Sequence, residues 1–457
     1  MAAHKSKRQK AQELINTRYE DLPYWTSLGL KFVAEGYKKA CQSIVPLASI
    51  MIVYFLLTPE SFDLRGKLLF AWSVGEVLFF LVCRKIFQAS FQRKLSPLGE
   101  AEMLETCRRV KENVGDMQQM MGQWLLEKPK GETYQEHFSE WISWLMFDRE
   151  EESLTSEEQV QLQRVLTEFC QGLKKSPKPL LHKPKCMRPS LDIFPIQPKP
   201  FVAYLGIKCI NALTYLTLRH LGFHRYSEDG LSYWHCSGNS SEPPIIFIHG
   251  LGIGLFPYLE KIRRLRQHSD KGILLLELPH ISMEIYHNIL NHDQTLAAID
   301  SLFKRHSLDK VSLVAHSYGT LIASWLIQHR QHLLHKVTLL DPICFNMWES
   351  TLVTNFLYAK PFAFSHEMAQ FFVAQDPLIS HTLTKEIYWY ESVLFPQDIH
   401  VPTNIFLSSQ DWVVDAAACA DYLHSSLPPS GKVHLLETSH GGYLTNPSEY
   451  GRVFNTL

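Results

Sequence analysis

The chain has 457 residues, 46% of them hydrophobic and 20% charged, which is long enough for two or three structural regions. Its formal net charge of -1 leaves no basic surplus and so argues against nucleic acid as a partner. The nine cysteines are scattered without a C-x-x-C pair. This usage predicts free thiols in a reducing compartment, and neither a disulfide framework nor a metal site. We expect no cofactor.

The first segment, residues 1–40, begins with basic residues, but no apolar run follows them directly. It is therefore not typical of a signal peptide. We predict that it lies in the cytosol, because lysines and arginines flank both outer ends of the apolar region that follows. The sequence does not indicate which organelle carries that membrane.

Residues 41–90 contain two apolar runs with cores at 43–58 and 68–83, joined by a short polar turn. Each run is slightly shorter than the roughly 20 residues of a spanning helix, but flanking lysines and arginines can extend it. Pro46 and Glu76 weaken the runs as independent spans. A membrane-spanning hairpin is favoured. A hairpin that enters one leaflet and returns, or a pair of buried core helices, stays open.

Three further regions precede the last part of the chain. Residues 91–173 have helical spacing of apolar residues and a Thr-Ser-Glu-Glu stretch suited to capping a helix, and we expect no chemistry there. Residues 174–200 hold seven prolines and are predicted to form a linker. Residues 201–223 are predicted to form an apolar helix that packs under the next domain or lies at a membrane surface.

From residue 224 to residue 457, short apolar runs alternate with helical stretches. The runs include PIIFIHG, GILLLELP, KVSLVAHS, KVTLLDP, TNIFLSS and KVHLLE. Nearly continuous apolar strands separated by helices predict a mostly parallel, doubly wound α/β sheet with both faces covered. Ligands bind such sheets at the carboxyl ends of the strands, so the chemistry should lie directly after these runs.

Ser317 stands in VSLVAHSYGT, where a predicted strand passes directly into a predicted helix. A sharp strand-to-helix turn would expose the Ser317 hydroxyl at the edge of the sheet. The turn needs small residues two positions before and after the serine, and Ala315 and Gly319 meet this need. The start of the helix would also stabilise negative charge beside His316 and Ser317. We therefore predict that Ser317 is a nucleophile.

A serine nucleophile needs a base and an orienting acid. His440 follows the last predicted strand and precedes two glycines, so it is the predicted base. Asp411 lies just beyond the preceding strand and is the favoured acid. Asp341, which also ends a strand, is the alternative acid, whereas Asp415 is predicted to cap a helix.

The developing oxyanion needs hydrogen-bond donors. The turn His249-Gly250-Leu251-Gly252 follows the first long parallel strand, so the N–H of Leu251 can point into the site. The N–H of Tyr318, beside the nucleophile, is the second predicted donor.

The motifs IFIHGLG, VAHSYG, SSQDWVV and SHGG fall in order at successive strand ends, and residues from about 230 onward resemble the α/β-hydrolase superfamily. The resemblance implies an α/β-hydrolase fold with a Ser317, Asp411 and His440 triad and two oxyanion-hole amides. With its hydrophobic hairpin, the whole chain is similar to a membrane-associated branch of that superfamily from fungi and other eukaryotes. That resemblance carries no substrate with it.

Residues 343–400 lie where the superfamily inserts a lid, and they are unusually aromatic. An apolar lid favours an apolar acyl or ester substrate. The sequence therefore predicts a membrane-associated serine hydrolase that cleaves a lipid-like carboxylic ester. An acyltransferase, thioesterase or amidase with the same triad, or a non-catalytic binding protein on this fold, stays open. The expected partners are a small apolar ester and the lipid bilayer. The acyl length, protein partners and oligomeric state are not predicted.

Overall fold

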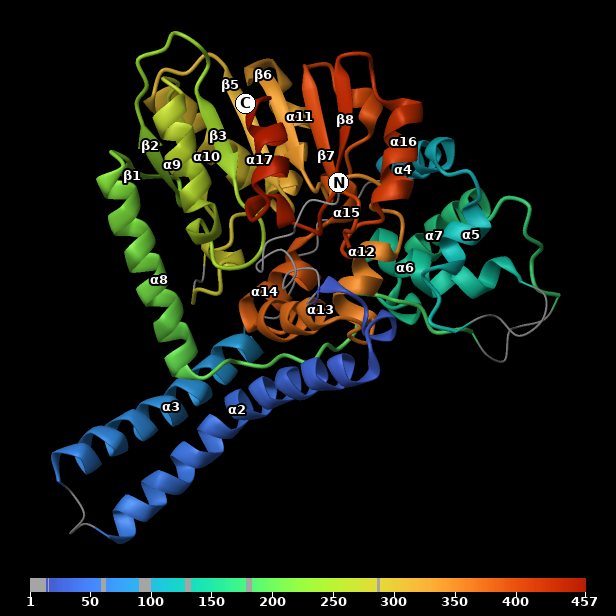
Figure 1. Cartoon of the computed structure of the whole chain (residues 1–457). Coiled ribbons are helices and arrows are strands. Elements are labelled where there is room, and N and C mark those ends of the chain that lie inside the picture. Colours follow the sequence, from blue (N-terminus) through green and yellow to red (C-terminus); the bar gives the residue numbers. More distant parts are fainter. Residues whose placement is uncertain are drawn as a thin grey trace.

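An eight-stranded sheet occupies the C-terminal half of the chain in the computed structural model (Figure 1). The structure describes residue 14 and residues 16–58, 63–89, 100–127, 133–177, 183–285 and 288–457. The strands are β1 (His224–Glu228), β2 (Leu231–Cys236), β3 (Ile245–Ile248), β4 (Ile273–Glu277), β5 (Val311–His316), β6 (Leu334–Leu340), β7 (Thr403–Ser408) and β8 (Gly431–Leu436).

The spatial order of the strands is β1-β2-β4-β3-β5-β6-β7-β8. Strand β2 pairs antiparallel with β1 and β4, and β3 to β8 pair in parallel. This strand order, with a nucleophile-type turn after β5, is that of the α/β-hydrolase fold, so the predicted fold class is confirmed. Strand β1 has no counterpart among the predicted runs, because it is an edge strand whose side chains are largely exposed and polar.

Helices cover both faces of the sheet, as the apolar strands require. Ile299, Leu321 and Leu423, from three different helices, pack into one core. Ile262 and Val453 pack into the core on the other face. The covering helices are α9 (Leu259–His268), α10 (His292–Arg305), α11 (Gly319–Arg330), α16 (Ala416–Ser426) and α17 (Pro447–Phe454). Such a buried two-faced core fixes the strand ends that carry the site.

Three long apolar helices lie outside this domain: α2 (Tyr24–Leu57), α3 (Leu64–Ala89) and α8 (Phe201–His220). Helices α2 and α3 run side by side and project away from the sheet, whereas α8 extends from α3 to the sheet edge at β1 (Figure 1). All three are long and apolar enough to cross a membrane, and little of their surface is buried. Helix α2 begins well before the apolar run at 43–58, and its first part, which carries both charged and apolar residues, packs against the lid.

Glu76 is the single acidic residue in the second predicted run and is fully buried. Its carboxylate accepts the backbone N–H groups of Phe201 and Val202 at 2.7 and 3.1 Å. The first N–H groups of a helix have no partner within that helix, and a carboxylate there is stabilising. Glu76 therefore joins α3 to the start of α8.

A second helical unit lies between the hairpin and the sheet in the sequence, and it comprises α4 (Glu100–Asn113), α5 (Met117–Gly122), α6 (Ser139–Phe147) and α7 (Ser156–Phe169). Its core contains Trp141, Leu166 and Phe169 and continues into the lid through Trp348 and Phe395. The helix α7 starts with the predicted capping box, in which Thr155 and Glu158 bond each other's backbone N–H groups.

The lid connects β6 to β7 and lies between the sheet and α2 (Figure 1). Its short α-helices alternate with three π-helical turns, which are rare in proteins and frequent at functional sites. The α-helices are α12 (Thr351–Val353), α13 (Phe364–Ala369), α14 (Pro377–His381) and α15 (Trp389–Ser392), and the π-turns are Thr354–Tyr358, Gln370–Ala374 and Thr382–Glu386.

Candidate active site

Ser317 occupies the turn between β5 and α11 with a backbone φ of 51°, a value that non-glycine residues rarely adopt. Its N–H donates to the carbonyl of Leu340, and its carbonyl accepts the hydroxyl of Thr320 at 2.6 Å. A Cβ on Gly319 would lie 2.6 Å from the carbonyl oxygen of Ile248, so only glycine fits there. Two neighbouring elements thus hold the strained serine in place.

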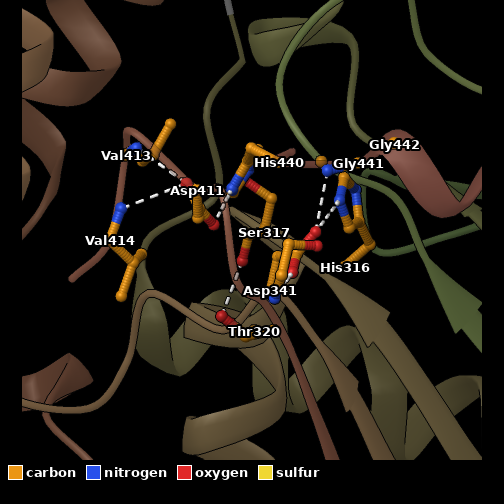
Figure 2. Close-up of polar contacts among 12 residues, drawn as sticks. His316, Ser317, Thr320, Asp341, Asp411, Val413, Val414, His440, Gly441 and Gly442 are labelled. Atoms are coloured by element: carbon orange, nitrogen blue, oxygen red, sulfur yellow. Dashed lines mark hydrogen bonds and ion pairs between the residues drawn. The ribbon is translucent and has the colours of Figure 1, made fainter. Parts of the chain in front are cut away.

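The structure brings the three residues of the predicted triad together (Figure 2). The Nε2 of His440 lies 2.8 Å from the Oγ of Ser317, and its Nδ1 lies 2.6 Å from the Oδ2 of Asp411. The other carboxylate oxygen of Asp411 accepts the N–H groups of Val413 and Val414 at 2.7 and 3.2 Å. These bonds orient the imidazole with one nitrogen toward the hydroxyl and the other toward a carboxylate.

The charge state of His440 follows from its surroundings. Burial disfavours the imidazolium, but the adjacent Asp411 carboxylate and the nearby Asp341 carboxylate outweigh burial and raise the pKa of His440 to about 9. The hydrogen bond from Nδ1 to Asp411 leaves Nε2 as the nitrogen that faces the hydroxyl of Ser317.

The predicted oxyanion donors lie beside the serine. Gly250 approaches the elbow so closely that an added Cβ would lie 2.9 Å from the Cβ of Ser317. Within the described part of the chain, the N–H groups of Leu251 and Tyr318 make no hydrogen bond. Both remain available to a substrate oxygen.

The turn before Leu251 has its own supports. His249 is buried, and its Nε2 accepts the N–H of Leu278 at 3.1 Å. Gly252 adopts φ +140° and donates its N–H to the carbonyl of Ile281 at 3.0 Å. These two residues hold the turn and leave the Leu251 amide open.

Asp341, the alternative acid, also lies at the site but makes other bonds (Figure 2). Its Oδ1 accepts the N–H of Ser408 at 2.9 Å, and its Oδ2 accepts the N–H of Gly441 at 2.7 Å. Of the two acids, Asp411 is the one hydrogen-bonded to His440. Asp415 caps α16 by accepting the N–H of Ala418.

A cavity of about 250 Å³ opens above Ser317 and His440. Its walls are mainly apolar and come mostly from the lid, the α5–α6 region and the loop after β7, with a contribution from Pro189 and Ser190 of the proline-rich segment. Representative wall residues are Phe356, Tyr390, Trp144, Phe147 and Trp412. The helical unit, for which no chemistry was expected, therefore supplies one wall of the pocket.

Sequence reasoning missed several residues that shape this site. Tyr258, Thr320 and the pocket residues Trp144 and Phe147 carry no motif that marks them. Tyr258 follows the glycine turn after β3 closely, which is the one local signal that could have drawn attention to it. The two aromatic residues reach the pocket only through tertiary packing.

No protein-family model and no curated protein matches the chain. Among solved structures, it is similar to a membrane phospholipase A described as a bacterial virulence factor, at 15% identity and a TM-score of 0.40, over 56% of this chain and 93% of that chain. It is also similar to a naproxen esterase from Bacillus subtilis, at 12% identity and a TM-score of 0.40, over 54% of this chain and 96% of that one.

An enol-lactonase from Burkholderia xenovorans is similar at 14% identity and a TM-score of 0.39, over 51% of this chain and 100% of that one. All three alignments therefore leave nearly half of this chain unmatched. At these identities the activities in the names describe those proteins only, and the fold assignment above rests on the strand order of this chain.

Proposed function

We propose that the protein is a serine hydrolase that cleaves a carboxylic ester. The observation that carries this proposal is the hydrogen-bonded series from Ser317 Oγ through His440 to Asp411, at 2.8 and 2.6 Å, on a strained turn. A hydroxyl is a weak nucleophile until an adjacent base takes its proton, and this arrangement supplies that base with its orienting acid.

In the proposed reaction, Ser317 Oγ attacks the ester carbonyl carbon while His440 Nε2 takes the hydroxyl proton. The carbonyl oxygen becomes an oxyanion that accepts the N–H groups of Leu251 and Tyr318. The tetrahedral intermediate then collapses, and the C–O bond to the alcohol breaks as His440 returns its proton to the leaving oxygen. Water, activated by the same imidazole, attacks the acyl-serine and releases the carboxylic acid.

The pocket favours an ester with an apolar acyl group. Aromatic and aliphatic side chains dominate its walls, and a few polar groups gather at Ser317 and His440. Binding sites of this composition bury apolar ligands and orient them through a few polar contacts.

We propose further that the protein works at a membrane. Most of the large apolar side chains that are exposed within the described residues lie on α2, α3 and α8. Exposed apolar surface of this extent marks contact with lipid or protein. The flanking lysines and arginines, together with nine free cysteines, support an orientation in which the catalytic domain faces the cytosol.

Other acyl-transfer reactions use the same machinery. An acyltransferase, a thioesterase or an amidase would differ in the leaving group or in the acceptor that releases the acyl-serine. A non-catalytic binding protein would need neither the base at Ser317 nor an open oxyanion site, so the complete constellation favours an enzyme.

The proposal is tested with a fluorophosphonate probe and a p-nitrophenyl ester. The wild-type protein should be labelled and should hydrolyse the ester, whereas Ser317→Ala should abolish labelling and lower kcat by about 10⁵- to 10⁶-fold. Ser425→Ala, an exposed serine on α16, is the matched control and should behave as wild type. A folded wild-type protein that reacts with neither reagent would rule out the serine hydrolase.

A further inference from the structure

Asp341 follows β6 and is almost completely buried, with 1% of its surface exposed. Its two oxygens bind backbone N–H groups from two different loops. One donor is Ser408, the last residue of β7, three positions before Asp411. The other is Gly441, directly after His440. A single carboxylate therefore ties the loop of the acid to the loop of the base.

The same carboxylate faces His316, the residue before the nucleophile. The Nε2 of His316 lies 3.8 Å from Asp341 Oδ2 and has no hydrogen-bond partner within the described residues. Its Nδ1 lies 2.7 Å from the hydroxyl of Tyr258, and that hydroxyl accepts the N–H of Gly250 at 3.2 Å. This series of polar groups, which is hydrogen-bonded from His316 onward, runs from the end of β6 to the turn that presents Leu251.

The protonation state of His316 is consistent with an N–H that points toward Asp341. Burial lowers the pKa of His316, so the ring is neutral and carries one N–H. If the Tyr258 hydroxyl donates to Nδ1 while it accepts from Gly250, the ring proton lies on Nε2 and points toward Asp341. Burial alone would disfavour the Asp341 carboxylate, but His316 and His440 outweigh it and hold its pKa below the ordinary value.

We propose that Asp341 is a positioning residue, which fixes the base loop, the acid loop and, through His316 and Tyr258, the oxyanion turn around Ser317. The inference rests on the proposed serine hydrolase function. It assigns the two acids different tasks: Asp411 orients the imidazole directly, and Asp341 sets the relative positions of the turns that carry the reacting groups. A buried carboxylate with several backbone donors suits this task, because each bond fixes a separate segment.

The negative charge of Asp341 should affect the pKa of His440, an effect that a purely structural role in packing would not have. The titratable groups that face His440 are Asp411, Asp341 and His316, and Tyr443 packs against His316. Asp341→Asn keeps the shape of the side chain and removes one negative charge. It should lower the pKa of His440 and move the acidic limb of the kcat/KM profile to lower pH by about one unit.

The experiment compares Asp341→Asn, Tyr258→Phe and Asp415→Asn with the wild type, with a p-nitrophenyl ester as substrate. Asp341→Asn should lower kcat by about 10- to 100-fold, the effect of losing one or two buried bonds to a charged group, and should shift the pH profile. Tyr258→Phe should lower kcat by about tenfold without a shift, since the hydroxyl is uncharged. Asp415→Asn, at a helix start outside the site, should match the wild type.

Hydrogen exchange gives a readout that needs no activity. Residues 249–252, 409–415 and 437–442 should exchange at least about tenfold faster in Asp341→Asn, and only residues 249–252 should do so in Tyr258→Phe. If Asp341→Asn does not fold, Tyr258→Phe still decides the outcome, because normal kcat and normal exchange in that variant would overturn the proposal.

Two further results would also overturn it: an Asp341→Asn variant equal to the wild type in rate, pH profile and exchange, or one as inactive as Asp411→Asn, which would make Asp341 the acid. An inactive, unlabelled wild type would instead contradict the proposed function, and the exchange measurements would still test the positioning role.

Discussion

The carboxyl edge of the sheet and the pocket above it are built in opposite ways. At the sheet edge, Ser317, Asp411 and His440 each follow a strand of the sheet, and the strand order brings them together. The pocket wall instead combines Trp144 from the helical unit with Phe356 from the lid, more than 200 positions away in the sequence. The edge is thus fixed by the fold class, whereas the pocket depends on how separate helical units pack.

The two regions should therefore respond differently to substitution. The proposed reaction depends on a few atoms at distances of hydrogen-bond length, so single polar substitutions should affect it strongly. The proposed acyl selectivity depends on a wall of many apolar contacts, so each substitution there should have a smaller effect. Substitutions at the sheet edge and in the pocket wall test this contrast.

The first prediction concerns the acid. Asp411→Asn should lower kcat by about 10⁴-fold, because an amide at this position favours the wrong tautomer of His440. Steady-state kinetics on a p-nitrophenyl ester measure the effect, and Asp415→Asn is the matched control. Activity within a factor of ten of the wild type would show that another residue orients the imidazole.

The second prediction concerns pH. The imidazole must be neutral to accept the proton of Ser317, and its pKa is raised to about 9. Below that pKa the protonated fraction dominates, so kcat/KM should rise about tenfold per pH unit from pH 7 toward pH 9. Near-ultraviolet circular dichroism over the same range controls for unfolding. A profile that is flat above pH 7 would contradict the stabilising effect of the two carboxylates on the imidazolium.

The third prediction concerns the pocket wall. Phe147→Leu should change the ratio of kcat/KM for long-chain and short-chain p-nitrophenyl esters by about tenfold, the usual effect of a small change in pocket volume. Phe138→Leu is the matched control, because Phe138 packs in the same helical core and does not line the pocket. Equal ratios in the wild type and in both variants would show that the helical unit has no part in acyl selection.

The fourth prediction concerns α8. Leu213→Lys combined with Leu216→Lys places two charges on its exposed apolar surface. If this surface contacts lipid, the variant should lose activity on esters embedded in vesicles, by up to about tenfold, and keep its activity on a soluble ester. Leu435→Lys, at an exposed position of β8, is the control. An unchanged ratio of the two activities would mean that α8 does not contact lipid.

The sequence predicted the sheet and the positions of the polar residues well, for a physical reason. Buried parallel strands need continuous apolar runs, and the residue after each run lies at the ligand-binding edge. Strand β1 was not predicted, because its side chains are largely exposed and polar and form no continuous apolar run. The first part of α2 was not predicted, because Lys38 and its charged neighbours resemble a solvent-exposed segment. In the structure, Lys38 binds Glu367 of the lid at 2.6 Å.

The different roles of Asp341 and Asp411 could not be predicted from the sequence. Asp341 and Asp411 follow adjacent strands, so both satisfy the same sequence rule. Only the bonds of Asp341 to Ser408 and Gly441 distinguish them. The apolar wall contributed by Phe147 was unpredictable for a different reason, since nothing in a local pattern says which distant helix it will meet.

Glu76 has a consequence for any shortened form of the chain. Because its carboxylate satisfies the first N–H groups of α8, removal of the hairpin would leave those groups, at Phe201 and Val202, without their partner. Each such loss costs about 1 to 3 kcal/mol when the group is buried. Removal of residues 1–200 would also delete Tyr19 and Lys38, which both bind Glu367 of the lid. Helices α2 and α3 are therefore structural parts of the protein, and a fragment cut at residue 200 would lose support at the lid and at α8 together.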